Sequence, residues 1–186
     1  MMPKHFAFFL FALLSVLCGF AALAQTTPGP TPSDPPAYRL GIDDKVRMVV
    51  YGEEQLSGDY VIGSQGAIAP PLIGQVVIAG LTVDEAQRKL TDAYAASYIN
   101  DPKVSLDVIE YRPFYILGEV NKAGQYPYRI GMTVLRAVAT AEGFTYRANK
   151  KKVAIQGSDG IERVVRLDAQ TPVQPGDTIR ILERYF

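Results

Sequence analysis

Tryptophan is absent from this sequence, and cysteine and histidine occur once each. Both single residues, Cys18 and His5, lie within the first 24 positions. The rest of the chain therefore cannot build a Ser-His-Asp triad, a Cys-His pair or the usual zinc sites. The formal net charge is zero, so the composition indicates no basic surface for nucleic acid. We expect a protein that is not an enzyme and has no catalytic residues, no metal and no cofactor.

Adjacent carboxylates are the remaining candidates for catalysis. Asp43-Asp44 and Glu53-Glu54 are such pairs. Neighbouring side chains on an extended chain point to opposite sides, whereas glycoside cleavage needs two carboxyl groups that face each other about 5 to 10 Å apart. We interpret all four as turn or solvated-loop residues without a chemical partner. Replacing any one of them by its amide is predicted to leave function intact.

The first 24 residues have the pattern of a secretory signal peptide. Lys4 supplies a positive charge, residues 6–20 are apolar or small, and Ala22-Leu23-Ala24 matches an A-x-A cleavage site. Cleavage after Ala24 is the preferred interpretation. An uncleaved membrane anchor and a lipoprotein signal ending at Cys18 are the alternatives. Residues 25–37 contain five prolines and are predicted to form an extended linker, although plain disorder predicts nearly the same behaviour.

The first folded domain is expected over residues 38–110. Thr82 and Glu85 form a capping box at the start of an amphipathic helix that is predicted to end near Tyr98. A polar loop is expected over residues 53–58. Strands are expected at residues 46–51, 60–62, 75–79 and 104–109.

This domain resembles the N-terminal domain of the bacterial polysaccharide biosynthesis/export proteins of the outer-membrane auxiliary class. One departure is Ile42-Asp43, where that family usually has Pro-Gly. The residues that carry the resemblance are Tyr38, Leu40, Gly41, Asp44, Gly66, Ile68, Pro71, Gly74, Gly80, Leu81, Thr82, Asp101, Pro102, Val104 and Leu106.

The second folded domain is expected over residues 111–186. Thr133 is predicted to cap a short helix that Gly143 ends. The basic run at residues 149–152 is interpreted as a solvated loop, with anion binding as the alternative. Strands are expected at residues 114–120, 125–129, 153–156, 164–167 and 178–182, with the third and fourth forming a hairpin.

The second domain resembles the soluble-ligand-binding β-grasp domain, abbreviated SLBB. Where this family usually has Ala-Gly-Gly, the sequence has Ala-Glu-Gly, and Glu142 is expected to continue the helix. The residues that carry the resemblance are Gly118-Glu119-Val120, Gly124, Tyr126, Gly131, Thr133-Val134-Leu135, Ala141-Glu142-Gly143 and Pro175-Gly176-Asp177. Residues 41–48 also resemble residues 175–181, each being an aspartate turn that leads into a strand, and we attribute this to common turn chemistry.

Together these patterns predict an α+β fold of two small mixed domains, an export domain followed by a β-grasp-like SLBB domain. Twelve residues are predicted to have structural roles in the two motifs: Gly41, Asp44, Pro71, Gly74, Gly80, Thr82, Pro102, Gly118, Gly124, Gly143, Gly176 and Asp177. Eleven tyrosines invite a sugar-stacking interpretation. Tyr51, Tyr60, Tyr115, Tyr126 and Tyr128 lie on or beside predicted strands, however, where core or inter-subunit packing is the commoner use.

The resemblance implies a periplasmic component of a polysaccharide export complex, associated with the outer membrane. Its implied partners are the polysaccharide, an inner-membrane chain-length regulator (co-polymerase) and further copies of itself in a ring. Sheet edges near Pro70-Pro71 and at the C-terminal strand are expected to support this self-association. A free carbohydrate- or ligand-binding protein is the alternative.

Larger relatives end in an amphipathic helix that lines an outer-membrane pore, whereas this sequence stops directly after its last predicted strand. No stretch after residue 24 has the roughly 20 apolar residues of a spanning helix. We therefore expect a separate outer-membrane β-barrel channel to carry the polymer across.

Overall fold

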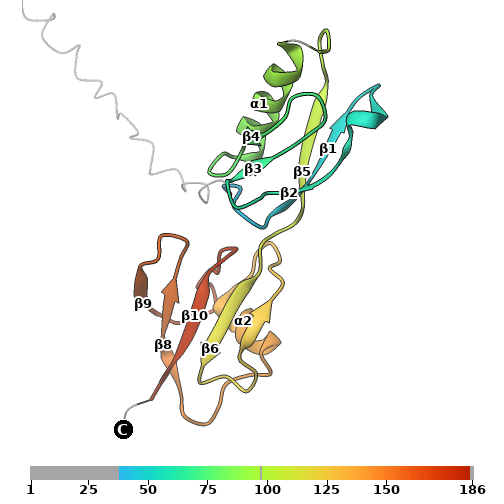
Figure 1. Ribbon diagram of the computed structural model, residues 1–186. Coiled ribbons are helices and arrows are strands. Elements are labelled where there is room, and N and C mark those ends of the chain that lie inside the picture. Colours follow the sequence, from blue (N-terminus) through green and yellow to red (C-terminus); the bar gives the residue numbers. More distant parts are fainter. Residues whose placement is uncertain (1–37, 97, 185–186) are drawn as a thin grey trace, which may run out of the picture. The chain divides into compact units, whose positions relative to one another are not determined.

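A computed structural model describes residues 38–96 and 98–184 (Figure 1). The predicted signal peptide and proline-rich linker lie outside the described residues. Within the described residues, no helix is long and apolar enough to cross a membrane.

The N-terminal half combines one helix with short antiparallel sheets (Figure 1). Three strands pair in the order β2-β1-β5, and β3 pairs with β4 in a separate two-stranded ladder. The bounds are β1 Lys45–Val50, a 3-10 helix Glu54–Leu56, β2 Gly58–Val61, β3 Ala67–Ile68, β4 Val76–Val77, α1 Val83–Ala95 and β5 Val104–Glu110.

Alternation along β1 explains why this sheet packs on one side. Val46, Met48 and Val50 are buried, and the residues between them are not. Helix α1 buries residues at helical spacing, including Leu90 and Tyr94, and packs on β5. One hydrophobic core results, and all of its buried members come from residues 40–106.

The C-terminal half is a five-stranded mixed sheet with one helix on it (Figure 1). The strand order is β7-β6-β10-β8-β9; β10 runs parallel to β6 and the other neighbours pair antiparallel. The bounds are β6 Phe114–Gly118, β7 Gly124–Tyr126, α2 Val134–Thr140, β8 Ala148–Gln156, β9 Glu162–Arg166 and β10 Thr178–Glu183. Its core is a second cluster, drawn from residues 114–181. The predicted α+β class is confirmed.

Both helices begin as predicted. Thr82 Oγ1 accepts a hydrogen bond from Glu85 N, and Glu85 Oε2 accepts one from Thr82 N, which completes the capping box. Thr133 Oγ1 accepts a hydrogen bond from Arg136 N at the start of α2. Helix α1 ends at Ala95, slightly earlier than predicted.

Three local predictions are wrong, and a fourth is right only in part. Residues 149–152 lie within β8, because β10 and β9 pair with this strand from its two sides. The C-terminal strand β10 lies between β6 and β8 and therefore presents no edge. Glu142 leaves the helix with a φ of 63°, so Ala141 is the C-cap and Gly143 follows outside the helix. The strand predicted over residues 75–79 is reduced to Val76–Val77.

Candidate functional site

Two aspartate turns of the same design lie at the starts of β1 and β10. Asp44 N donates to Gly41 O, and Asp44 Oδ2 accepts a hydrogen bond of 2.7 Å from Gly41 N. Asp177 N donates to Gln174 O, and Asp177 Oδ2 accepts one of 2.7 Å from Gln174 N. The similarity noted between residues 41–48 and 175–181 is therefore a shared turn, in which the carboxylate closes the loop that feeds a central strand.

The residue before each aspartate has a left-handed backbone. Gly176 has a φ of 84°, which glycine adopts without strain, and Asp43 has a φ of 70°. Asp43 stands where the export family usually has glycine. Glu142, the other departure from a family glycine, also has a positive φ. Both departures thus place a side chain at a left-handed backbone position, a conformation that favours glycine.

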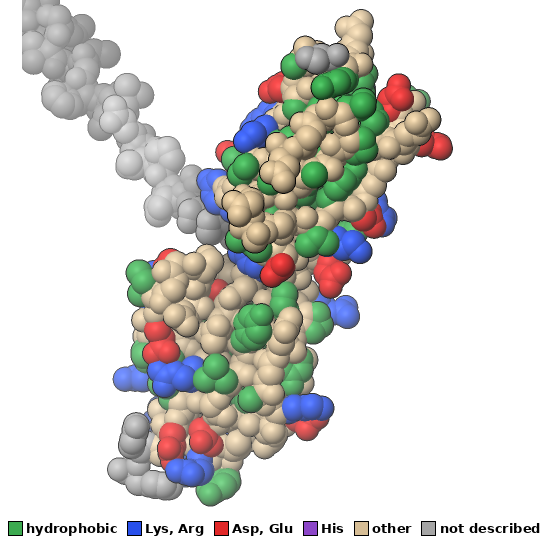
Figure 2. Space-filling model, in the orientation of Figure 1, with side chains coloured by type: hydrophobic (Ala, Val, Ile, Leu, Met, Phe, Trp, Pro, Cys, Tyr) green, Lys and Arg blue, Asp and Glu red, His purple; other side chains and the backbone are tan. Residues whose placement is uncertain are grey.

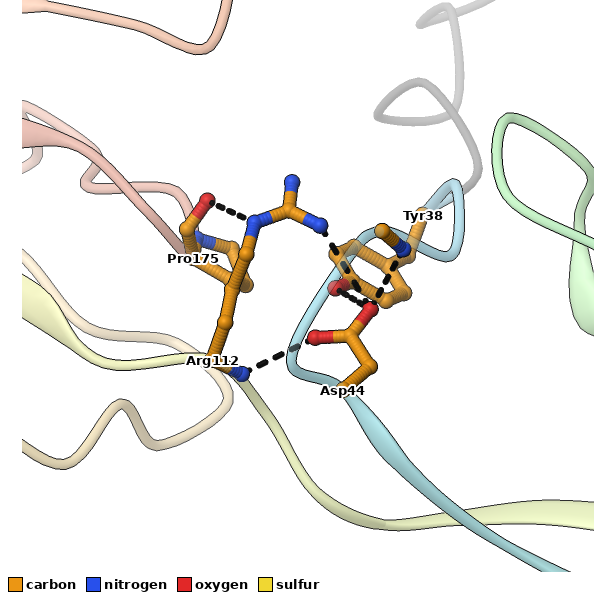
Figure 3. A network of polar contacts seen from close by, with 5 residues as sticks. Tyr38, Asp44, Arg112 and Pro175 are labelled. Atoms are coloured by element: carbon orange, nitrogen blue, oxygen red, sulfur yellow. Dashed lines mark hydrogen bonds and ion pairs between the residues drawn. The ribbon is translucent and has the colours of Figure 1, made fainter. Parts of the chain in front are cut away.

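Asp44 is fully buried and holds four donors (Figure 3). Besides Gly41 N, Asp44 Oδ2 accepts from the Tyr38 hydroxyl at 2.5 Å and from Arg112 Nη1 at 3.5 Å. Asp44 Oδ1 accepts from Arg112 N at 2.9 Å. The interpretation of Asp44 as a turn residue without a partner is wrong, because its partner Arg112 is distant in the sequence.

Arg112 connects the two turns. Its Nε donates to Pro175 O at 3.0 Å, and its Nη1 forms the ion pair with Asp44. A methyl group added at Gly41 would lie 1.5 Å from Arg112 Nη1, and one added at Gly176 would lie 2.7 Å from Arg112 Nε. The two motif glycines therefore leave the space that the arginine side chain occupies.

A row of three aromatic rings begins beside this arginine. Tyr111 contacts Tyr38 edge to face with ring centroids 5.0 Å apart, and contacts Tyr128 in the same way at 5.6 Å. The Arg112 guanidinium lies 5.8 Å from the centre of the Tyr38 ring. We refer to Tyr38, Asp44, Tyr111, Arg112 and Tyr128 as the arginine clasp.

Burial governs the electrostatics of the arginine clasp. It is the largest cause that raises the pKa of Tyr38, and the hydrogen bond to Asp44 raises it further, so the phenol stays protonated. Burial also raises the pKa of Asp177, while the hydrogen bond from Gln174 N and the charge of Arg112 act in the opposite direction. Asp44 is enclosed by four donors that tie it to the backbone, Tyr38 and Arg112, so the geometry suits a structural joint.

The other motif residues occupy turns, caps and close approaches. Pro71 O accepts a hydrogen bond from the buried Tyr94 hydroxyl at 3.2 Å. At Gly118, φ is 87° and an added methyl group would lie 2.2 Å from Ile181 O, so this position needs glycine. Gly74 and Gly80 have positive φ, Pro102 is buried before β5, Gly124 begins β7, and Gly143 N donates to Val138 O.

Three of the five candidate sugar-stacking tyrosines are half-buried: Tyr60, Tyr126 and Tyr128. Tyr51 is 84% exposed and Tyr115 is 44% exposed. The described residues contain no group of three or more histidine, cysteine, aspartate or glutamate side chains that could hold a metal ion.

The sequence did not single out Tyr111 or Arg112. Both follow β5 directly, at the border between the two predicted domains, and a tyrosine beside an arginine there was the only signal. Their partners lie far away in the chain, so no local pattern could reveal the contact.

Comparison with known proteins identifies both halves. The profile of the polysaccharide biosynthesis/export protein family matches residues 32–109, and the SLBB domain profile matches residues 112–181. The chain therefore carries a polysaccharide biosynthesis/export domain followed by an SLBB domain. The arginine clasp therefore joins the turn of one family domain to the turn of the other.

The chain is similar to named proteins of two bacteria. It is 29% identical over 159 residues to the exopolysaccharide production protein ExoF of Rhizobium meliloti, which covers 79% of this chain. It is 34% identical over 147 residues to the EPS I polysaccharide export outer membrane protein EpsA of Ralstonia solanacearum, which covers 65% of this chain. In each case the chain spans 36% of the length of the relative.

Proposed function

We propose that this protein is a component of the machinery that exports an extracellular polysaccharide. The observation that carries this is the uninterrupted order of an export domain and an SLBB domain, in a chain similar to ExoF and EpsA. The arginine clasp supports a mechanical role, because it joins the two domains without offering a reactive group. The protein acts without catalysis in this proposal.

The finer proposal concerns place and assembly. We place the protein in the periplasm, associated with the outer membrane, after removal of its signal peptide. Copies form a ring that conducts the polymer from an inner-membrane chain-length regulator to an outer-membrane channel. Among the described strands, β3 and β4 pair only with each other, so a neighbouring copy could cover the outer edge of either one.

Gene deletion and complementation test the main proposal. Loss of the gene should abolish secreted polysaccharide while lipid-linked repeat units continue to form, and the wild-type gene should restore secretion. Unchanged secretion in the deletion strain would contradict the export role. Accumulation of cleaved or modified polymer that depends on the protein would contradict the non-enzymatic role.

Sedimentation separates a ring component from a free binding protein. The purified protein is run over a concentration series, with and without its inner-membrane partner. A closed oligomer in either condition supports the ring. A strict monomer in both supports the alternative, a free periplasmic carbohydrate-binding protein.

A further inference from the structure

The SLBB sheet has one face that the helix does not cover. Helix α2 packs against the face that carries Ile116 and Ile179. The residues that alternate with these along each strand point to the opposite face of the sheet. The strand register aligns this second face, which we name the outer face, in three rows across the sheet: Tyr115, Thr178, Gln156 and Glu162; Leu117, Arg180, Ala154 and Val164; Lys152 and Arg166.

The outer face carries an unneutralised pair of like charges. Lys152 lies directly opposite Arg166 on the neighbouring strand, and both are exposed. Within the described part of the chain, no carboxylate lies within ion-pair distance of either side chain. The acidic residue of the rows, Glu162, already pairs with Arg180. Like charges directly opposite each other destabilise a sheet, so the pair fits a surface that meets an anion.

Two shallow hollows flank this pair. One is lined by Lys150, Lys151, Lys152, Val164, Val165, Arg166 and Leu167, a set with four basic side chains and no acidic one. The other extends along β10 past Lys152, Val164 and Arg180. Glu119 and Glu183 lie at its far end, where Thr145 donates to Glu119 and Arg147 pairs with Glu183.

Apolar groups stand among these charges. Tyr115 is 44% exposed, Leu117 38% and Val164 57%. Figure 2 shows hydrophobic, basic and acidic side chains side by side over the surface of β8, β9 and β10. An aromatic ring and aliphatic groups suit the apolar faces of pyranose rings, and the basic groups suit carboxylates carried on those rings.

We propose that the outer face binds an acidic polysaccharide, with Lys152 and Arg166 contacting its carboxylates and Tyr115 stacking on a sugar ring. This inference rests on the proposed export function and specifies the class of polymer. Burial of a carboxylate between Lys152 and Arg166 relieves their mutual repulsion, so a uronate-type polymer binds more tightly than a neutral glucan of equal length. Charge complementarity of this kind gives selectivity between acidic and neutral polymers.

The binding test uses purified protein, oligogalacturonates of defined length and dextran oligosaccharides matched to them. Calorimetry at low and high salt should show binding of oligogalacturonate that weakens with salt, and no saturable binding of dextran. Lys152→Gln/Arg166→Gln should weaken binding roughly tenfold, which corresponds to loss of two exposed ion pairs. Tyr115→Ala should weaken it about threefold or more, and Tyr115→Phe should retain it.

A control variant with the same change in net charge isolates the surface. Arg88→Gln/Arg136→Gln removes two exposed arginines, one on α1 and one on α2 at the other side of the SLBB sheet. It should bind oligogalacturonate like the wild type. Equal weakening by both double variants would overturn the proposal, because total charge and not the outer face would then control binding.

Further probes identify other occupants. Tighter binding to phosphatidylglycerol vesicles or to single-stranded DNA than to oligogalacturonate would overturn the assignment to polysaccharide, as would equal affinity for dextran. Failure of binding in a protein whose gene still restores secretion would reject the outer-face site and leave the export role intact. Binding of oligogalacturonate by the protein, together with unchanged secretion after deletion of its gene, would support the outer-face site and reject the export role.

Discussion

Asp44 and Asp177 occupy equivalent turns, but their side chains differ in the contacts that they make outside the turn. Both accept a hydrogen bond from the backbone nitrogen three residues earlier. Asp44 also accepts from Tyr38 and from Arg112, whereas burial is the dominant influence on the pKa of Asp177. An amide in place of Asp44 directs an NH₂ group at other donors, whereas an amide in place of Asp177 keeps the acceptor that its turn needs.

We predict that Asp44→Asn lowers the free energy of unfolding by about 2–4 kcal/mol, because it takes the charged acceptor away from buried donors and from the Arg112 guanidinium. Asp177→Asn should change the free energy of unfolding by less than about 1 kcal/mol in either direction. Urea denaturation of the two variants beside the wild type provides the measurement. Similar losses in both would show that the turns alone, and not the arginine clasp, give Asp44 its importance.

Asp177 should also make stability depend on pH in the acid range. Burial raises its pKa in the folded state, so the protonated side chain contributes stability that is fully present below the unfolded value of about 4. That contribution is lost as pH rises through the folded pKa. The stability of Asp177→Asn relative to wild type should therefore increase with pH from ~3 to ~6. A constant or falling difference in denaturation midpoints would contradict this.

At the scale of elements, sequence patterns predicted the features that depend on residues close together in the chain. The capping box of α1 and the Thr133 cap of α2 were predictable because donor and acceptor are three residues apart. Residues 149–152 were predicted as a loop because four polar residues outweigh strand propensity locally. Pairing with β10 and β9 overrides that preference, and no local pattern contains the partner strands.

The turn before β1 offers a stabilising change. Asp43 has a φ of 70°, a conformation that costs most residues about 1–2 kcal/mol and costs aspartate less. Asp43→Gly should therefore raise the free energy of unfolding by roughly 0.5 kcal/mol, after the added freedom of glycine in the unfolded chain. Asp84→Gly, in the first turn of α1, is the control and should lower it. Thermal denaturation measures the stability of both variants. A lower stability of Asp43→Gly than of the wild type would contradict backbone strain at Asp43.

At the scale of the whole molecule, contacts between distant segments decide what the sequence could not. The C-terminal strand was predicted at an edge, yet β10 lies at the centre of its sheet because it pairs in parallel with β6. Arg112 and Asp44 are similarly remote from each other in the chain. The domain families were recognisable from motif order, whereas the arginine clasp between them required the three-dimensional structure.

The arginine clasp should couple the unfolding of the two halves. Each half has its own hydrophobic core, and the Arg112 side chain bonds to Asp44 in one and to Pro175 in the other. We predict that the wild type unfolds in a single calorimetric transition and that Arg112→Ala unfolds in two. Arg47→Ala is the matched control, because Arg47 pairs with Asp59 within one sheet at the surface, where an ion pair contributes little to stability. It should lower the midpoint slightly while keeping one transition. Equal calorimetric and van't Hoff enthalpies in Arg112→Ala would show that the two halves still unfold together. In that case contacts other than the Arg112 side chain couple their unfolding.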